Sequence, residues 1–346
     1  MTSVLPEVIR DVEQLDDLLS EPTEAVVQTM GRLEGDLIVL GVAGKMGPTL
    51  ARMARRASDA AGVRRRIIGV SRFSSAEGRQ RLQAHGIDTI QGDLLEPELV
   101  ESLPDVPNVV YMVGMKFGTT GNEPLTWAAN TYVPSLVCRK FRKSRIAAFS
   151  TGNVYGNVPV AGGGSLETDV PRPCGEYAMS ALGRERMFEY FSQQLGIPTV
   201  LIRLNYAVEM RYGVLVDLAQ KVYREAPIDL AMGYANVIWQ GDASAMTLAS
   251  LADAATPPLC VNVTGPQCLR IRDVCEQFGR LFGKPVKFVG SEAADALLSN
   301  AQAACGRYGP PRVGVDQMMR WIAHWIAQGG ASLGKPTHFE VRNGTF

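Results

Sequence analysis

Short apolar runs and amphipathic segments alternate along most of this chain. The apolar runs are bounded by glycine, proline or polar residues, as the strands of a buried sheet are, and the intervening segments repeat apolar residues at helical spacing. The pattern predicts strands at 37–40, 66–72, 86–91, 108–113, 145–150 and 199–204, and helices at 48–61, 75–85, 125–143 and 176–195. This alternation predicts an α/β fold with a parallel, doubly wound sheet.

The same pattern divides the chain into three parts. Residues 1–34 repeat apolar residues at helical spacing, which predicts a helical arm that packs on the surface or on a partner subunit. Residues 35–205 hold the alternating strands and helices. Residues 206–346 predict a smaller C-terminal lobe, from which some segments, such as a strand at 259–263, return to the sheet.

Three glycines follow the first strand at a spacing of three, at Gly41, Gly44 and Gly47. Gly41 allows a tight turn, Gly44 lets the backbone approach a pyrophosphate, and Gly47 lets the next helix pack closely on the strand. The helix N-terminus then offers N–H groups to the phosphates. We expect a Rossmann-type dinucleotide site that includes Lys45 and Met46 of the loop; the alternative is an ordinary glycine-containing loop.

Composition narrows the function further. The 346 residues hold 35 basic and 35 acidic side chains, a balance that gives no electrostatic footprint for nucleic acid or an anionic membrane. No apolar run reaches membrane-spanning length, and the N-terminus does not resemble a signal peptide. The six cysteines form no Cys-x-x-Cys pair, and the three histidines share no ligand spacing with them. We therefore expect a cytoplasmic protein with reduced thiols and no metal site.

Further motifs follow in a fixed order. They are Gly92-Asp93, Asn130, the segment 150–156, Tyr177 and Arg203-Leu204-Asn205. With the glycine motif, this set resembles the extended short-chain dehydrogenase/reductases of the NAD(P)-dependent sugar epimerase/dehydratase group over about residues 35–265. The resemblance implies an oxidoreductase or epimerase acting on a secondary alcohol or ketone of a sugar, nucleotide sugar or sugar-derived acid. It also implies a substrate-binding role for the C-terminal lobe and a homodimer formed through the helices at 125–143 and 176–195.

The resemblance also assigns the cofactor contacts. Asp93, with Leu94 after it, matches the residue that bonds adenine. The end of the second strand reads the ribose, and here it carries Ser71-Arg72 where NAD enzymes usually place an acid. A cation suits a 2′-phosphate, so NADP is favoured over NAD, unless Arg72 is only a solvated loop charge. The other expected cofactor contacts are Val113, Gly114, Lys116, Asn130 and Tyr177, where Lys116 matches a lysine that contacts cofactor phosphate in UDP-galactose 4-epimerase.

Thr151 and Tyr177 match the catalytic pair of the family. The threonine hydroxyl bonds the reacting oxygen of the substrate, and the tyrosine moves the proton. The family lysine four residues after the tyrosine is replaced by Ala181. Three explanations are open: Arg184 or Lys116 supplies the missing charge, Tyr177 works at an unshifted pKa, or the protein binds a dinucleotide without turnover, as a regulator or scaffold.

The substrate side also departs from the family. Gly152-Asn153 replaces the acid pair of dTDP-glucose dehydratases, so sugar dehydration by that route is not expected. Ala235 replaces an arginine that clamps sugar diphosphates, which makes a smaller polyhydroxylated or carboxylated substrate as plausible as a nucleotide sugar. The candidate substrate contacts are Lys116, Asn153, Asn205, Glu209, Arg211, Tyr212 and His338.

For two of these candidates, Arg211 and His338, the sequence leaves a second interpretation open. Arg211 offers a fork for a carboxylate or phosphate, or else forms a structural salt bridge. His338 is a supplementary proton donor if the tail at 334–346 folds over the cleft rather than remaining disordered. A lyase or isomerase that uses the cleft without hydride transfer is a third functional class, after the oxidoreductase and the regulator.

Overall fold

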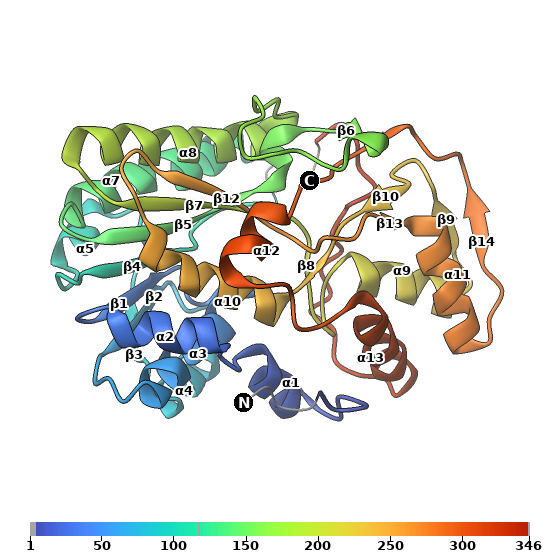
Figure 1. The fold of residues 1–346 in the computed structure, drawn as a ribbon, viewed down its shortest axis with the longest axis horizontal. Helices are drawn as coiled ribbons and strands as arrows, with labels where there is room; N and C mark the ends of the chain where they lie inside the picture. The colour runs from blue at the N-terminus through green and yellow to red at the C-terminus, as the bar shows by residue number, and fades with distance from the viewer. Residues whose placement is uncertain (1–4, 117, 119, 345–346) are drawn as a thin grey trace.

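The computed structural model describes residues 5–116, 118 and 120–344, and its central element is a seven-stranded parallel sheet (Figure 1). The order is β3-β2-β1-β4-β5-β7-β12. The strands span Leu37–Leu40 (β1), Ile67–Ser71 (β2), Asp88–Gln91 (β3), Asn108–Tyr111 (β4), Arg145–Thr151 (β5), Thr199–Leu204 (β7) and Leu259–Val263 (β12). The strand order reverses direction between β1 and β4, where doubly wound sheets place their ligand crevice. The predicted fold class is therefore confirmed, and so is the return of the strand near residue 260.

Alternate side chains of the strands enter two different cores. Leu37 and Val39 face a core shared with α2 (Glu24–Arg32), α3 (Gly47–Ala60) and α10 (Gln240–Ser250). Ile38 and Leu40 face the core under α5 (Pro97–Ser102), α7 (Val133–Lys140) and α8 (Gly175–Leu195). Successive side chains of a strand point to opposite faces of the sheet, and helices cover both faces here. All four residues of β1 are therefore apolar.

The helix predicted at 125–143 is interrupted. It begins as α6 (Glu123–Trp127), passes through a π-helical turn at Ala128–Tyr132, and continues as α7. Such turns widen one helical turn by a residue. Asn130 lies in this turn, and its side chain is turned into the protein interior.

The C-terminal lobe is built around three helices, α9 (Val214–Tyr223), α11 (Ile271–Phe282) and α13 (Val315–Ala327). Four two-stranded sheets, counted over the described residues, surround them. The edge strand expected at 284–289 is β14 (Lys287–Val289), paired with β9 (Pro227–Asp229). The shorter elements are α4 (Ala76–Ala84), α12 (Gln302–Tyr308), β6 (Val158–Pro159), β8 (Ala207–Val208), β10 (Tyr234–Ala235), β11 (Ile238–Trp239), β13 (Leu269–Arg270) and β15 (Asp295–Ala296).

The N-terminal arm is helical, as predicted, but it is not a surface appendage. In α1 (Val12–Leu19), Leu15 and Leu19 are fully buried in the core of the C-terminal lobe. In α2, Val26 and Met30 are buried in the core beside the sheet. The apolar stripe of each helix therefore belongs to a different lobe, and the arm joins the two; its residues 1–4 lie outside the described part of the chain.

The C-terminal segment 333–344, called the strap below, returns from the C-terminal lobe to the sheet lobe (Figure 1). It begins where the Leu333 N–H donates to the carbonyl of Arg211 at 3.1 Å. It ends where Gly344 packs on Cys174 and Gly175, because a Cβ on Gly175 would lie 2.2 Å from the Gly344 carbonyl oxygen. Residues 345–346 of the predicted tail lie outside the described residues.

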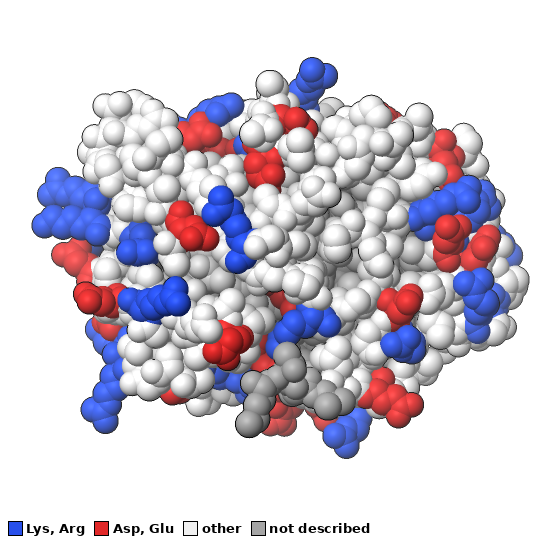
Figure 2. All heavy atoms as spheres, viewed as in Figure 1, with Lys and Arg blue, Asp and Glu red and all other residues white. Residues whose placement is uncertain are grey.

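The charged side chains do not gather by sign on the face shown in Figure 2, where basic and acidic groups of the described residues are interspersed. Within residues 5–116, 118 and 120–344, the structure contains no helix of the length and apolarity that crossing a bilayer requires.

Candidate active site

The glycine-rich loop lies between β1 and α3, at the carboxyl edge of the sheet. Gly41 has a φ of +88°, and a Cβ on Gly47 would lie 2.2 Å from the Val42 carbonyl oxygen, so both positions require glycine. Among the described residues, no side chain caps the first turn of α3, whose N-cap position is Met46. Its N–H groups can therefore bind phosphate oxygens. The residues present fit the pyrophosphate of a dinucleotide, which the loop from Gly41 to Gly47 would hold.

Arg72 and Asp93 lie together at the ends of β2 and β3. The Arg72 guanidinium is 3.8 Å from the Asp93 carboxylate, and its side chain is 76% exposed. The Asp93 carboxylate also accepts from the Leu95 N–H at 3.1 Å, which fixes the turn that contains Leu94. Ser71 ends β2 beside them. The structure thus brings the four expected adenosine contacts together, and a pair this exposed can exchange its partner for a ligand group.

The side chain of Asn130 fixes the loop after β4 through hydrogen bonds. Its amide donates to the Met115 carbonyl at 3.2 Å and to the Ser180 hydroxyl at 2.8 Å, and its oxygen accepts from the Met115 N–H at 3.0 Å. The side chain is fully buried, so the expected direct contact with the cofactor is corrected: Asn130 positions the loop that carries Val113, Gly114 and Lys116. The π-helical turn is the physical reason, because it directs Asn130 inward.

Arg184 is a buried cation that packs directly under Gly114. It donates to the Phe149 carbonyl at 2.9 Å and to the Asn130 side chain, and among the described residues its Nε has no hydrogen-bond partner. A Cβ on Gly114 would lie 2.3 Å from the guanidinium. Both hydrogen-bond acceptors are neutral oxygens, so the positive charge of Arg184 is not cancelled by these contacts.

Thr151 and Tyr177 are hydrogen-bonded to each other. Thr151 ends β5, and Tyr177 lies in the first turn of α8. Burial raises the pKa of Tyr177 above its usual value, while the charge of Arg184 and the bond from Thr151 act in the opposite direction. The net direction is thus opposite to the lowering that the family lysine would give.

The position that the family lysine would occupy is buried in this protein. Ala181 is fully buried and packs in a small cluster with Val154 and Tyr155. Lys116 approaches Tyr177 instead, with its Nζ 5.8 Å from the centre of the ring. Burial lowers the pKa of Lys116 to about 8. Two cations, Arg184 and Lys116, thus lie near the tyrosine, although neither occupies the position four residues after it.

Three predicted substrate contacts, Asn205, Glu209 and Arg211, bond to other residues of the protein. Asn205 is buried and its amide donates to the Asn236 side chain at 3.0 Å. Arg211 forms ion pairs with Glu209 at 3.1 Å and with Asp16 of α1 at 2.9 Å. Burial raises the pKa of Glu209, against the opposing effect of Arg211. The substrate fork expected at Arg211 is thus corrected to the structural salt bridge, since two acids at different places in the chain converge on it.

The other predicted substrate contacts lie beside the glycine-rich loop, just after Thr151 and in the strap. Tyr212 lies under Lys45, whose Nζ is 3.2 Å from the centre of the ring. Asn153 follows Thr151 in a short 3-10 helix and donates its N–H to the Thr151 hydroxyl at 3.2 Å. His338 lies in the strap, between the buried residues Thr337 and Phe339.

Sequence patterns missed Asp217, Tyr206 and Lys335. Asp217 lies in the first turn of α9 and accepts from both the N–H and the hydroxyl of Thr337. Tyr206 has a φ of +50° and lies within electrostatic reach of Tyr177. None of these residues belongs to a motif. The tail that carries Lys335 is unusually rich in charged and apolar residues, and this was the available signal in the sequence.

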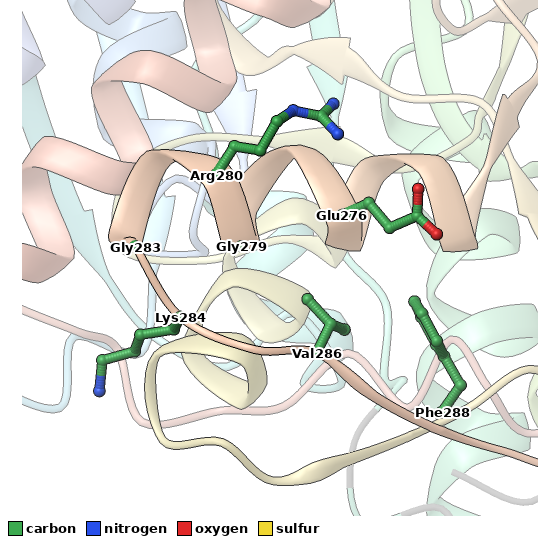
Figure 3. A pocket seen from close by; sticks show the side chains of 7 residues that line it. All are labelled: Glu276, Gly279, Arg280, Gly283, Lys284, Val286 and Phe288. Carbon is green, nitrogen blue, oxygen red and sulfur yellow. The ribbon is translucent and has the colours of Figure 1, made fainter.

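A separate hollow of about 430 Å³ opens between α11 and the segment leading to β14. Figure 3 shows Glu276 and Arg280 on α11, and Lys284, Val286 and Phe288 on the segment that follows the helix. None of these residues belongs to the predicted site.

The comparisons with known proteins agree with this geometry. A model of the NAD dependent epimerase/dehydratase family matches residues 37–208. No curated protein sequence matches the chain. The UDP-glucuronic acid 4-epimerase of Bacillus cereus, solved with UDP-glucuronic acid and NAD, is 18% identical, with a TM-score of 0.70 over 85% of this chain and 99% of that chain.

Two further solved structures are similar. The dTDP-glucose 4,6-dehydratase of Bacillus anthracis, solved with NAD, is 15% identical, with a TM-score of 0.72 over 85% of this chain and 97% of that chain. The UDP-glucose 4-epimerase of Thermus thermophilus, solved with NAD, is 20% identical, with a TM-score of 0.67 over 84% of this chain and 98% of that chain. At such identities the likeness establishes the fold. The family match spans the glycine cradle and the β5 end that carries Thr151, so residues 37–208 of this chain match the model of the NAD dependent epimerase/dehydratase family.

Proposed function

We propose that this protein is an NAD(P)-dependent oxidoreductase or epimerase that acts on a secondary alcohol or ketone of a sugar, nucleotide sugar or sugar-derived acid. The observation that carries the proposal is the hydrogen-bonded pair of Thr151 and Tyr177 at the same sheet edge as the glycine cradle. The cofactor, when bound, supplies hydride transfer. Thr151 orients the reacting oxygen, and Tyr177 accepts or returns its proton.

Arg184 is proposed as the positioning residue that replaces the family lysine. Its charge stabilises the ionised form of Tyr177, and its hydrogen bonds fix the strand end and the loop beneath the cofactor site. Lys116, nearer the surface, is proposed to contact the cofactor or the substrate. Asn153, Tyr212 and His338 are proposed as substrate contacts, and Gly152-Asn153 argues against dehydration, because no acid follows Thr151.

A regulator that binds a dinucleotide without turnover is the second candidate. The raised pKa of Tyr177 and the closed position of Ala181 favour it, because a neutral tyrosine is a weak base. Cofactor binding without turnover of any member of a polyol and sugar-acid panel would support this candidate over the enzyme.

The choice of cofactor can be tested by calorimetry with NAD and NADP. The relatives solved with NAD favour NAD, whereas Arg72 at the ribose position favours NADP. We expect Arg72→Ala to weaken NADP binding by about tenfold and to leave NAD nearly unchanged. Gly44→Asp should abolish binding of both, because a carboxylate would face the pyrophosphate. Absence of binding to either dinucleotide by the unaltered protein would overturn the proposed function.

The catalytic pair can be tested by single substitutions. Tyr177→Phe should lower kcat by about 10²- to 10⁴-fold, and Thr151→Ala should lower it by a smaller factor, because the proton acceptor is lost only in the first. Thr151→Ala should keep the dinucleotide affinity measured by calorimetry. Ser102→Ala, a change at an exposed residue of α5, is the control. Full turnover by Tyr177→Phe would contradict the assignment.

The role of Arg184 can be tested through the pH dependence of oxidation. Because its charge lowers the pKa of Tyr177, Arg184→Gln should move the rising limb of kcat/KM to higher pH by about one unit. Arg184→Lys keeps the charge and should restore most of the original profile. Thermal unfolding of both variants serves as the folding control. An unchanged profile in Arg184→Gln would show that Arg184 has only a structural role.

We also propose a homodimer through α6 and α8. These helices, with the π-helical turn between α6 and α7, expose Leu125, Trp127, Tyr132, Met179 and Tyr190. In light scattering after gel filtration, Leu125→Glu with Tyr190→Glu should convert dimer to monomer, because two charges would enter the apolar contact. Val170→Glu, at an exposed apolar residue outside these helices, should leave the dimer intact. A monomeric unaltered protein would refute the proposal.

A further inference from the structure

A buried ion pair joins α8 to β7 beside the end of β5. The Arg203 guanidinium binds both carboxylate oxygens of Glu185, with Nη2 2.7 Å from one oxygen and Nε 3.0 Å from the other. The Glu185 side chain is 0% exposed and that of Arg203 is 5% exposed. Burial lowers the pKa of Arg203, but the hydrogen bonds and the charge of Glu185 outweigh burial and raise it above its usual value. The guanidinium therefore stays charged beside the carboxylate.

Glu185 also fixes the end of β5. The Ser150 hydroxyl donates to the Glu185 carboxylate, and Ser150 is the residue before Thr151. Thr151 itself is bonded to Tyr177, which lies on the same helix as Glu185. Two consecutive residues of β5 are thus joined to α8, and a displacement of the helix along the strand would strain both bonds.

Arg203 fixes the segment that follows Thr151. Its Nη1 donates to the Tyr155 hydroxyl at 2.8 Å, and that hydroxyl donates to the side chain of Asn262 in β12 at 2.7 Å. Tyr155 ends the 3-10 helix that begins after Thr151, and within this helix the Asn153 N–H donates to the Thr151 hydroxyl at 3.2 Å. The guanidinium therefore secures the segment that holds the threonine hydroxyl from its other side.

Thr151 thus lies between two segments that one ion pair secures. Ser150 before it is bonded to the carboxylate, and the 3-10 helix after it is bonded to the guanidinium. Stability alone is a weak reason for such a pair, because well-packed apolar residues often replace buried ion pairs without loss. Catalytic groups, in contrast, need supporting contacts that hold them closely in place, since small displacements of reacting groups cost large factors in rate.

We propose that Glu185 and Arg203 are positioning residues, and that their ion pair holds the Thr151 hydroxyl at hydrogen-bonding distance from Tyr177. The inference rests on the proposed function, to which it adds the groups that set the geometry of the proton transfer. The role differs from that of Arg184, whose charge acts on the pKa of Tyr177. The charges of Glu185 and Arg203 compensate each other, so the pair acts through geometry.

The test removes each flanking bond and leaves the ion pair in place. Ser150→Ala removes the hydroxyl that donates to Glu185, and Tyr155→Phe removes the hydroxyl that links Arg203 to β12. Glu185→Gln is the third variant, because it keeps an oxygen that accepts from Ser150 and loses the charge opposite Arg203. Melting temperatures show which variants are folded.

Two matched changes serve as controls. Ser144→Ala removes another buried serine hydroxyl, which bonds to the Val106 carbonyl just before the start of β5. Tyr308→Phe removes another tyrosine hydroxyl, which bonds to Asp253 at 2.9 Å. Neither bond involves a residue next to Thr151.

The readout is the resonance of Tyr177 in the full-length, ligand-free protein labelled with ¹³C at the tyrosine Cζ. Because Cζ carries the hydroxyl, its chemical shift reports the hydrogen bond of that hydroxyl, and no substrate is needed. Tyr177→Phe identifies the resonance among those of the ten tyrosines. We expect the three test variants to shift it by more than the line width, and both controls to leave it in place.

Turnover gives a second readout where the proposed function holds. With the panel substrate that the unaltered protein turns over, Ser150→Ala and Tyr155→Phe should each lower kcat by about three- to tenfold. Their NAD or NADP affinity in calorimetry should stay the same. The pH profile should also stay the same, because neither change removes a charged group.

Several outcomes would overturn the proposal. A Tyr177 resonance that stays in place in all folded test variants would do so, and so would equal shifts in the controls, since any lost buried bond would then suffice. A shift in Ser150→Ala without one in Tyr155→Phe would reject the role of Arg203 and keep that of Glu185. If no dinucleotide binds, the oxidoreductase proposal fails, and the resonance of the ligand-free protein still decides whether the ion pair positions Thr151.

Discussion

The site depends on the common direction of the strands in the central sheet. Because β1, β2, β3, β4 and β5 are parallel, their carboxyl ends meet at one edge, and residues far apart in sequence become neighbours there. A strand of opposite direction would carry its terminal residue to the other edge. The order of the strands adds the second requirement, since the reversal between β1 and β4 opens the crevice into which the glycine cradle faces.

Arg184 supplies a positive charge near Tyr177, where Ala181 replaces the family lysine. The apolar packing of Val154 and Tyr155 around position 181 leaves no room for a lysine there. The cation is instead Arg184, two helical turns after Tyr177 in α8. Its position under Gly114 requires that residue to lack a side chain. A buried guanidinium bonded only to neutral oxygens is costly, and such an arrangement is expected where the charge acts on a neighbouring group.

The sheet, the cradle and the Thr151–Tyr177 pair could be predicted because their patterns are local. Strand periodicity, glycine spacing and the residue at a strand end all act over a few positions. Asn205 was expected to contact substrate, and the role of Arg211 stayed open between two alternatives, because their partners, Asn236 and Asp16, are distant in sequence. The placement of Lys335 depends on the path of the strap, which is set by contacts with Arg211 and Asp217. No periodicity in the chain encodes such a path.

The N-terminal arm has a mechanical consequence for ligand exchange. Leu15 is embedded in one lobe and Met30 in the other, while Asp17 of α1 pairs with Arg52 of α3 across the boundary. Bending the lobes apart would expose apolar surface on both helices and break that ion pair, at an unfavourable free energy. The arm is thus a brace against hinge motion.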